Sequence, residues 1–537
     1  MVKLLVANIS VLRQTRQEIE SCSKSQVATV HPHKICDTCS NESRGKIVSD
    51  ELSEMLGTGS TTALRIEENG INVIAEFERK GQPRELFWPW FGANISVLGL
   101  SYGSYVLGFG ISFWQAVVVG FIGITASFLL CGYIATAGKR GSAPTMVLSR
   151  AAFGIRGNRV PSAISWLLCV GWETALTVIA VLATSTVFTR LGWGGGTDVK
   201  VLALLVVGAL IVGGGVMGFD LIMRMQAVIT VVTGVLSIAF IVLTFKHISW
   251  HVVSHVHAGT TQSLIGALVF VMTGFGLGWV NTAADYSRYL PRHTSTREVV
   301  WWTTFGSSLA PVILLFFGLL LAGSSSALSS AVGNDPVGAL ANLLPTWFLV
   351  PFVIVAILGL VGGAVLDIYS SGLALLSAGI KIPRYAAAAV DGVIMVIGTI
   401  YIVFVSGSFL YQFEGFLITV GVLIAAWCGV FIADLALRRN DYSDADLFTA
   451  SGRYGDVRLA PIVTIIAASF LGWGLVTNSS ASWLKWQGYL LEPLGLGGKT
   501  GAWAFANLGV LVALVLSFAV TLLFDRKYVT TQEVADV

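Results

Sequence analysis

Charged residues are scarce in this chain of 537 residues, making up 12%, whereas hydrophobic residues make up 55%. An average soluble domain is about a quarter charged, so a chain of this composition does not cover a water-facing surface. The scarcity of charge excludes a cytosolic enzyme and a secreted disulfide-rich scaffold, and it predicts an integral membrane protein surrounded by the lipid bilayer. The net charge of +3 is too small to indicate a nucleic acid as a partner.

Cysteine and histidine are also few, with 6 and 7 residues. In the N-terminal region, His31 and His33 stand close to Cys36 and Cys39, a spacing that would suit a zinc site. No second Cys-x-x-Cys pair accompanies them in the sequence, so chance polar residues in a tail are the favoured interpretation. We therefore expect neither a bound metal nor a cofactor.

Residues 1–85 are polar and hold 11 of the 33 Lys and Arg residues and 12 of the 30 Asp and Glu residues. Ser, Thr, Glu and Lys are common there and no long apolar period appears, which is typical of weakly structured segments. We expect residues 1–85 to form a disordered cytoplasmic tail. Met55 is an alternative start of the chain within this tail.

Apolar runs dominate the chain from Leu86 onward, and twelve of them are long enough to span a bilayer, which takes about 20 residues. The sequence therefore predicts an all-α integral membrane protein with twelve transmembrane helices. The expected spans cover residues 88–110, 114–137, 161–188, 200–217, 225–245, 262–283, 299–322, 346–379, 386–406, 409–434, 459–478 and 502–524.

The distribution of basic residues predicts the orientation of these spans. The loops after the even-numbered spans hold 15 Lys and Arg residues, whereas the loops after the odd-numbered spans hold 5. Lys and Arg stay preferentially on the cytoplasmic side of a membrane. Both termini are therefore expected in the cytoplasm, which an even number of spans requires, and the expected location is the plasma membrane.

Glycine is abundant, with 59 residues, and it recurs in the first and sixth spans. The first span holds Gly99 and Gly103, and the sixth holds Gly274, Gly276 and Gly278. Glycine is unfavourable inside helices, so these runs predict unwound stretches, which survive at membrane depth only inside protein or beside a cavity. Breaks in spans one and six are expected for an inverted repeat of five helices. The alternative is that the glycines allow close helix packing.

Two carboxylates, Glu173 and Asp367, fall in the middle of predicted spans. A charged residue at the centre of a span costs about 3 kcal/mol, and such residues usually mark an ion path, a proton relay or a ligand contact. The alternative is a structural pair, each carboxyl protonated or hydrogen-bonded to a neighbouring helix. Asp391, Glu414 and Asp434 lie nearer the ends of predicted helices, where we expect them to face water.

Many of the 16 Trp residues fall where an interfacial aromatic belt is expected, Trp88 and Trp90 among them. Trp172 and Trp279 instead fall deep in the third and sixth spans, and Trp279 lies at the predicted break. Two indoles that face one cavity would suit a flat heteroaromatic ligand, since stacking provides affinity and a few polar groups fix the orientation. Core packing is the alternative for either tryptophan alone.

Several short motifs follow one another between residues 84 and 440. They are Phe-Trp-Pro-Trp-Phe-Gly-Ala-Asn at 87–94, Ser-Arg-Ala-Ala-Phe-Gly-Ile-Arg-Gly-Asn at 149–158, Gly-Trp at 171–172 and 278–279, and Ala-Asp-Tyr-Ser-Arg-Tyr at 284–289. In their order and spacing, these motifs resemble the cytosine/purine/uracil/hydantoin permeases, the first nucleobase–cation symporter family.

The resemblance implies both a fold and an activity. The fold would be a LeuT-like core of ten helices in a five-plus-five inverted repeat, here 86–440, with broken helices one and six. Two accessory helices would follow in 441–524, and then a cytoplasmic C-terminal tail in 525–537. The activity would be that of a secondary active transporter, not an enzyme, which imports a nucleobase or a related flat nitrogen heterocycle of the cytosine/purine class by cation symport and alternating access.

The resemblance also implies a substrate site. In relatives an aromatic residue of the third helix and one of the sixth sandwich the ring, and Trp172 and Trp279 match these positions. An Asn of the eighth helix often contacts the ring, and Asp367 stands in its place. Many relatives carry an amide four residues after the tryptophan of the third helix, where this chain has Leu176. Residues at the two breaks complete the predicted substrate site: Asn94, Phe275 and Gly278.

The coupling cation is expected to be a proton rather than sodium. Sodium-driven relatives bind the ion with carbonyls of the first helix, here near Ala93 and Ser96, and with hydroxyls of the eighth. The corresponding stretch of the eighth span, 360–364, has no hydroxyl group. Two carboxyls at membrane depth, Asp367 and Glu173, instead favour proton coupling.

The motif after the sixth span is expected to close the cytoplasmic side of the site. Asp285 and Arg288 are the candidate gate residues, and the alternative is a helix-end cap followed by a positive-inside arginine. For the whole protein, an amino-acid or other small-solute symporter of the same fold is the closest alternative. A membrane-embedded enzyme or a receptor is the alternative outside the transporters.

Overall fold

The computed structural model describes residue 67 and residues 69–406, 409–478 and 482–534, all within one compact unit, Leu64–Val537. Helices and connecting segments make up these ranges, and no β-strand is found in them. The possible zinc ligands at 31–39 and the alternative start at Met55 lie outside the described residues.

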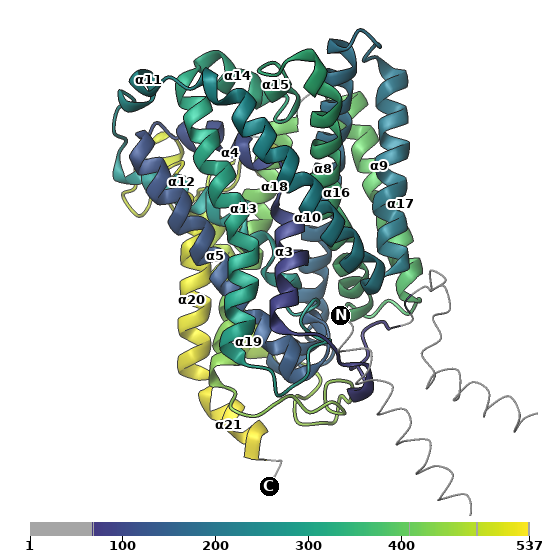
Figure 1. Cartoon of the computed structure of the whole chain (residues 1–537). Helices are drawn as coiled ribbons and strands as arrows, with labels where there is room; N and C mark the ends of the chain where they lie inside the picture. The colour runs from purple at the N-terminus through teal and green to yellow at the C-terminus, as the bar shows by residue number, and fades with distance from the viewer. Residues whose placement is uncertain (1–66, 68, 407–408, 479–481, 535–537) are drawn as a thin grey trace, which may run out of the picture. The chain divides into compact units, whose positions relative to one another are not determined.

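The helices form one bundle, with α11, α14 and α15 at the upper end of Figure 1 and α21 at the lower end. Their bounds are α3 Phe87–Asn94, α4 Leu98–Leu107, α5 Phe113–Gly141, α6 Thr145–Leu148, α7 Arg150–Phe153, α8 Arg159–Arg190, α9 Thr197–Met217, α10 Phe219–Thr244, α11 Trp250–Ser254, α12 Thr261–Gly274, α13 Thr296–Ser324, α14 Ser326–Asn334, α15 Gly338–Ala341, α16 Leu349–Ser377, α17 Arg384–Tyr401, α18 Phe409–Leu437, α19 Leu459–Gly474, α20 Leu508–Phe524 and α21 Arg526–Val534.

The apolar character of these helices confirms the predicted membrane protein. Within the described ranges, nine segments are long and apolar enough to cross a bilayer, or ten if α20 and α21, bent by 57°, count as one span. The nine correspond to predicted spans two to ten. Spans one, eleven and twelve correspond to shorter helices, namely α3 with α4, then α19, then α20. The total of twelve and the inverted repeat therefore stay predictions.

The first span is broken, but not at its glycines. Helix α3 ends at Asn94 and α4 begins at Leu98, so the interruption precedes Gly99 and Gly103. Gly103 lies inside α4, and a Cβ there would collide with the backbone of Gly318 on α13. The break therefore lies beside Asn94, as expected, but Gly103 does not unwind the helix and instead serves the close helix packing named as the alternative.

The sixth span breaks where its glycines predicted. Helix α12 ends at Gly274, and two 3₁₀ turns follow, η4 Gly276–Gly278 and η5 Val280–Thr282. The unwound backbone is satisfied by α5, since Gly276 N donates to Ser127 Oγ at 3.1 Å and Gly276 O accepts from Cys131 Sγ at 3.1 Å. This agrees with the rule that irregular backbone at membrane depth must find partners within the protein.

Contacts between helices define two groups. In the α13 group, α13 packs on α3, α4 and α5, and α12 packs on α5. In the α16 group, α16 packs on α8, α9 and α17. The two groups meet where α3 packs on α16, and α10 and α18 each contact both groups. The broken first span therefore lies at the boundary between the groups.

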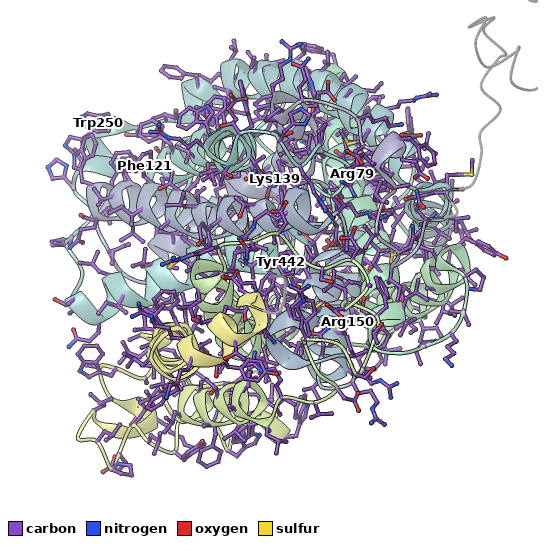
Figure 2. The ribbon with its side chains drawn as sticks, turned by 90° about the horizontal axis from the view of Figure 1, so that it is seen from below. Arg79, Phe121, Lys139, Arg150, Trp250 and Tyr442 are labelled. Carbon is purple, nitrogen blue, oxygen red and sulfur yellow. The ribbon has the colours of Figure 1, made fainter. Side chains whose placement is uncertain are left out.

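The lower end of the bundle, where α5 ends and α8 begins, carries many paired cations. Arg438 donates to Asp434 at 2.6 and 2.8 Å, and both side chains are buried. The expectation that Asp434 faces water is therefore wrong, because Arg438, one turn later, supplies its donors. Arg150 donates to Leu447 O at 3.0 Å, and Figure 2, seen from this end, labels Arg150 and Tyr442.

Candidate functional site

Trp172 lies against the break of the sixth span. Trp172 is part of α8 and is 8% exposed. A Cβ built on Gly278 would lie 3.1 Å from Trp172 Nε1. Within the described chain this Nε1 is buried and has no hydrogen-bond partner. Phe413 packs on the ring edge-to-face, with the centroids 5.1 Å apart. The indole N–H is thus a free donor beside unwound backbone.

Trp279 follows Gly278 directly, so the structure brings both predicted tryptophans to the same break. Its ring is partly buried and packs edge-to-face on Trp90, with centroids 5.8 Å apart. Trp90 in turn packs on Tyr286 at 5.6 Å. The expectation that Trp90 belongs to an interfacial belt is wrong, because it is 1% exposed inside this aromatic cluster. Its position one helical turn before Asn94 is the signal that could have placed it near a break.

Asp367 and Glu173 are buried carboxyls on facing helices, α16 and α8. Asp367 is 2% exposed and Glu173 is 0% exposed. Among the described residues, Asp367 Oδ1 and both Glu173 oxygens have no hydrogen-bond partner. Native proteins rarely leave buried polar atoms unpaired, so these oxygens are candidates for binding a proton, water or a ligand.

Tyr286 connects the sixth span to α16 beside Asp367. Its hydroxyl donates to Leu366 O at 2.8 Å and lies 2.9 Å from Ser370 Oγ. Because Leu366 directly precedes Asp367, this contact fixes the α13 group against the α16 group at the level of the buried carboxyl. The sequence analysis did not assign this role to Tyr286.

Asp391 on α17 is a third carboxyl of this region. It is 0% exposed, and it accepts from Trp166 Nε1 at 2.7 Å and from Ser371 Oγ at 2.9 Å. The prediction that Asp391 faces water is wrong, because two donors inside the protein replace water. The same prediction for Glu414 is not tested, because its side chain lies outside the described part of the structure.

The candidate residues of the first break are occupied by local contacts. Asn94 Nδ2 donates to Trp90 O at 2.8 Å, and Ser96 Oγ accepts from Leu98 N at 3.3 Å. Ala93 is 7% exposed and ends α3 with Asn94. At the other break, Phe275 packs on Tyr102 of α4, with the centroids 4.5 Å apart.

A glycine stripe on α16 covers the carbonyls of the first break. A Cβ on Gly359 would lie 2.8 Å from Ile95 O, and a Cβ on Gly362 would lie 2.8 Å from Gly92 O. A third glycine, Gly363, would bring its Cβ to 3.4 Å from the Ala93 carbonyl oxygen. The eighth span thus packs directly on the backbone of the first.

A cavity of about 550 Å³ lies beside the end of α12, just before the break of the sixth span, and extends to α14 at the upper end of the bundle. Thr273, two residues before Phe275, is part of its wall, together with Tyr105 and Phe270. Helices α4, α12, α14 and α18 and residues from 477–478 and 502–510 contribute to the lining. The cavity reaches Thr273, whose carbonyl oxygen would lie 3.4 Å from a Cβ on Gly278, but neither Trp172 nor Trp279 is part of its lining.

At the lower end, Asp285 and Arg288 contact different partners. Asp285 Oδ1 accepts from Thr145 N at 2.7 Å and from Thr145 Oγ1 at 2.8 Å, so it caps the first residue of α6. Burial raises the pKa of Asp285 to about 6, against the opposing effect of these hydrogen bonds. Arg288 is 0% exposed and donates to Tyr369 Oη at 2.7 Å. The two gate candidates are therefore both buried at the lower end and bind different partners.

Comparison with known proteins connects this geometry to a family. The family model for permeases of cytosine/purines, uracil, thiamine and allantoin matches residues 73–482. The protein YxlA of Bacillus subtilis (strain 168), whose name assigns it to the purine-cytosine permeases, is 22% identical over 450 residues, covering 82% of this chain and 93% of YxlA. The purine-cytosine permease FCY2 of Saccharomyces cerevisiae (strain ATCC 204508 / S288c) is 25% identical over 289 residues, about half of each protein.

Solved structures show the same fold at low sequence identity. The closed conformation of MHP1, a nucleobase-cation-symport-1 family transporter, superposes with a TM-score of 0.63 at 18% identity, covering 87% of this chain and 97% of MHP1. A Na⁺-coupled sialic acid symporter gives 0.57 at 11% identity, covering 90% and 96%. The expected transporter fold is therefore confirmed. From the match over 73–482, the chain belongs to the family of permeases for cytosine/purines, uracil, thiamine and allantoin.

Proposed function

We propose that this permease imports a flat nitrogen heterocycle of the cytosine/purine class across the plasma membrane by proton symport. One observation carries the proposal: the free indole N–H of Trp172 lies against Gly278, at the break that Trp279 follows. Membership in a permease family makes the chain a transporter, so the enzyme and receptor alternatives no longer apply.

The chemistry of the break supports a nucleobase. Aromatic side chains stack on flat rings and supply apolar contact area, while a few polar groups set the orientation. Asp367 Oδ1 is a free acceptor for ring N–H groups, and Trp172 Nε1 is a free donor for a ring nitrogen or carbonyl. The relatives YxlA and FCY2 carry the names of purine-cytosine permeases.

The packing around the first break supports a proton as the coupling cation. Sodium needs a shell of oxygen ligands, but the glycine stripe of α16 packs on the carbonyls of Gly92 and Ile95 and brings no hydroxyl. Ser96 Oγ is already bonded to Leu98 N. Glu173 and Asp367 are buried carboxyls without partners among the described residues, and intramembrane carboxyls of this kind commonly relay protons.

Alternating access follows from the two helix groups. The charge bias of the loops supports a cytoplasmic location for the lower end and both termini, and with this orientation the 550 Å³ cavity would be the external vestibule. Substrate enters there and reaches Trp172 and Trp279. The α13 group then rocks against the α16 group, and the contacts of Asp285 and Arg288 at the lower end open toward the cytoplasm.

Uptake of radiolabelled cytosine, adenine, hypoxanthine and allantoin tests the proposal in a strain that lacks its own permeases. We expect uptake of at least one compound, loss of uptake with a protonophore, and no dependence on sodium. Trp172→Ala is expected to lower uptake by about tenfold, since an aromatic contact and its buried area are lost. The matched control is Trp483→Ala, because Trp483 is 72% exposed.

Two results would overturn parts of the proposal. Competition by amino acids without competition by nucleobases would favour an amino-acid symporter of the same fold. Accumulation that follows a sodium gradient and ignores the protonophore would exclude proton coupling, while leaving the nucleobase site intact.

A further inference from the structure

Glu67 places its carboxylate among buried tyrosines and arginines at the lower end of the bundle. Its Oε1 accepts from Tyr289 Oη at 2.5 Å, from Tyr369 Oη at 3.2 Å and from Arg288 Nη2 at 3.2 Å. The Glu67 side chain is 11% exposed, and the Arg288 side chain is 0% exposed. One carboxylate oxygen of Glu67, which precedes the first helix of the bundle, therefore accepts hydrogen bonds from three side chains of the bundle.

The second oxygen of Glu67 binds a different part of the core. Its Oε2 accepts from Phe219 N at 2.8 Å and lies 3.7 Å from Arg384 Nε, a guanidinium that is 1% exposed. Gly218 makes this approach possible: its φ is +95°, and a Cβ there would collide with Glu67 Oε2. Both oxygens are thus bound in a site shaped to receive them.

These contacts connect the two helix groups. Arg288 and Tyr289 follow the sixth span and belong to the α13 group, whereas Tyr369 and Arg384 lie on α16 and α17 of the α16 group. Arg288 also donates directly to Tyr369 Oη at 2.7 Å, so Glu67 completes a network that already crosses the boundary. If the two groups rock apart at this end, the contacts of Glu67 must break.

The residues after Glu67 run along the same end as a strap. Gly70 O accepts from Arg288 Nη1 at 2.8 Å, Ile74 N donates to Ser142 O at 2.8 Å, and Lys80 N donates to Tyr289 O at 2.8 Å. Ile74 is 0% exposed. Residues 70–80, which the sequence analysis assigned to the polar tail, therefore pack on the bundle. They contact the end of α5 and the segment that follows η5.

We propose that Glu67 is a latch that holds the cytoplasmic gate closed and must withdraw before the site opens inward. Two buried guanidiniums, on Arg288 and Arg384, share this one carboxylate, and removal of a partner from a buried charge is strongly unfavourable. The latch would stabilise the closed gate selectively, because Glu67 binds one arginine from each of the two helix groups and separation of the groups would break one of these contacts. The inference rests on the proposed orientation, with the lower end in the cytoplasm.

Cysteine labelling from the cytoplasmic side tests the latch without any substrate. Ser370→Cys places a thiol between the buried site and Glu67, since Ser370 Oγ contacts Tyr286 Oη and the residue is 2% exposed. Full-length protein in inside-out vesicles is treated with a membrane-impermeant maleimide. Labelling is read by mass spectrometry at the peptide that contains residue 370, so native cysteines do not interfere.

In this background, Glu67→Gln is expected to raise the labelling rate about tenfold, the effect of losing one strong charge-assisted network. The matched control is Glu76→Gln, which removes the same charge from the same strap at an exposed position. Tyr369→Phe removes one donor to Glu67 and is expected to give a smaller increase. Glu67→Asp, which keeps the charge, is expected to restore part of the protection.

Equal labelling in Glu67→Gln and Glu76→Gln would overturn the latch. If Glu67→Gln does not give a monodisperse protein, Tyr369→Phe tests the latch in its place. Labelling of Tyr369→Phe at the same rate as Glu76→Gln would then overturn the latch. Because labelling needs no substrate, a protein that transports no nucleobase would refute the proposed function and leave the latch standing.

Discussion

The indole nitrogen of Trp172 and the α-carbon of Gly278 face each other so closely that a methyl group on Gly278 would lie 3.1 Å from Nε1 and 3.4 Å from Cε2. The contact joins the third span to the unwound part of the sixth. The close packing of the Trp172 ring on the sixth span therefore depends on the absence of a side chain at residue 278.

Gly278→Ala is therefore expected to impair substrate binding more than folding. The added methyl pushes the Trp172 ring by a few tenths of an ångström and narrows the site, so we expect the apparent KM for nucleobase uptake to rise about tenfold, as for a modest overpacking cost. Uptake kinetics in cells with matched surface expression check this. Gly213→Ala on α9 is the control, because a Cβ there meets no atom within 4 Å. An unchanged KM would mean that the substrate does not occupy this space.

Glu173→Gln and Asp367→Asn test the coupling of transport to protons. Each amide fills the same volume but cannot take up and release a proton, so we expect pH-driven accumulation to be lost. Glu173→Gln should still exchange labelled for unlabelled substrate, because exchange needs no net proton movement. Asp367→Asn is expected to weaken binding as well, since Asp367 is also the acceptor that we propose for the ring N–H groups of the substrate. Proteoliposomes with an imposed pH gradient separate accumulation from exchange.

The control for these carboxyl variants is Asp198→Asn, an exposed residue in the first turn of α9. Accumulation that survives in both Glu173→Gln and Asp367→Asn would remove both carboxyls from the coupling path.

Asp285 gives the protein a specific pH dependence of stability. Its pKa is raised from 3.8 to about 6 by burial, so between these values the folded protein binds a proton that the unfolded chain has released. Stability therefore falls as the pH rises through this window, by up to about 3 kcal/mol for a shift of two units. Asp285→Asn still accepts from Thr145 and should remove this slope. Thermal unfolding in detergent from pH 4 to pH 7 measures it, and parallel curves for both proteins would contradict the assignment.

The features that the sequence predicted correctly are those determined by local composition. Run length and scarcity of charge predict spans two to ten, and the alternating glycines predict the break after Gly274. Burial of Trp172, Glu173 and Asp367 follows from their distance to the span ends. Each of these properties depends on neighbours within a few residues along the chain.

The features that the sequence analysis missed depend on partners far away in the chain. Gly103 serves packing because Gly318 faces it, not because the helix unwinds there. Trp90 is buried because Trp279 and Tyr286 enclose it. Glu67 lies in a polar segment that reads as a tail, and only the convergence of Arg288 and Arg384 gives its carboxylate a site. No local pattern carries these pairings.

Asp391 allows hydrogen bonding to be separated from charge. Asparagine at this position can still accept from Trp166 Nε1 and can donate to Ser371 Oγ, whereas leucine leaves two buried donors without an acceptor. Unsatisfied buried donors cost about 1–3 kcal/mol each, so Asp391→Leu is expected to lower Tm by several degrees and Asp391→Asn to leave it nearly unchanged. Thermal unfolding of the purified variants checks the order. Equal loss in both would mean that the charge of Asp391 stabilises this junction of α8, α16 and α17, and that its two hydrogen bonds do not.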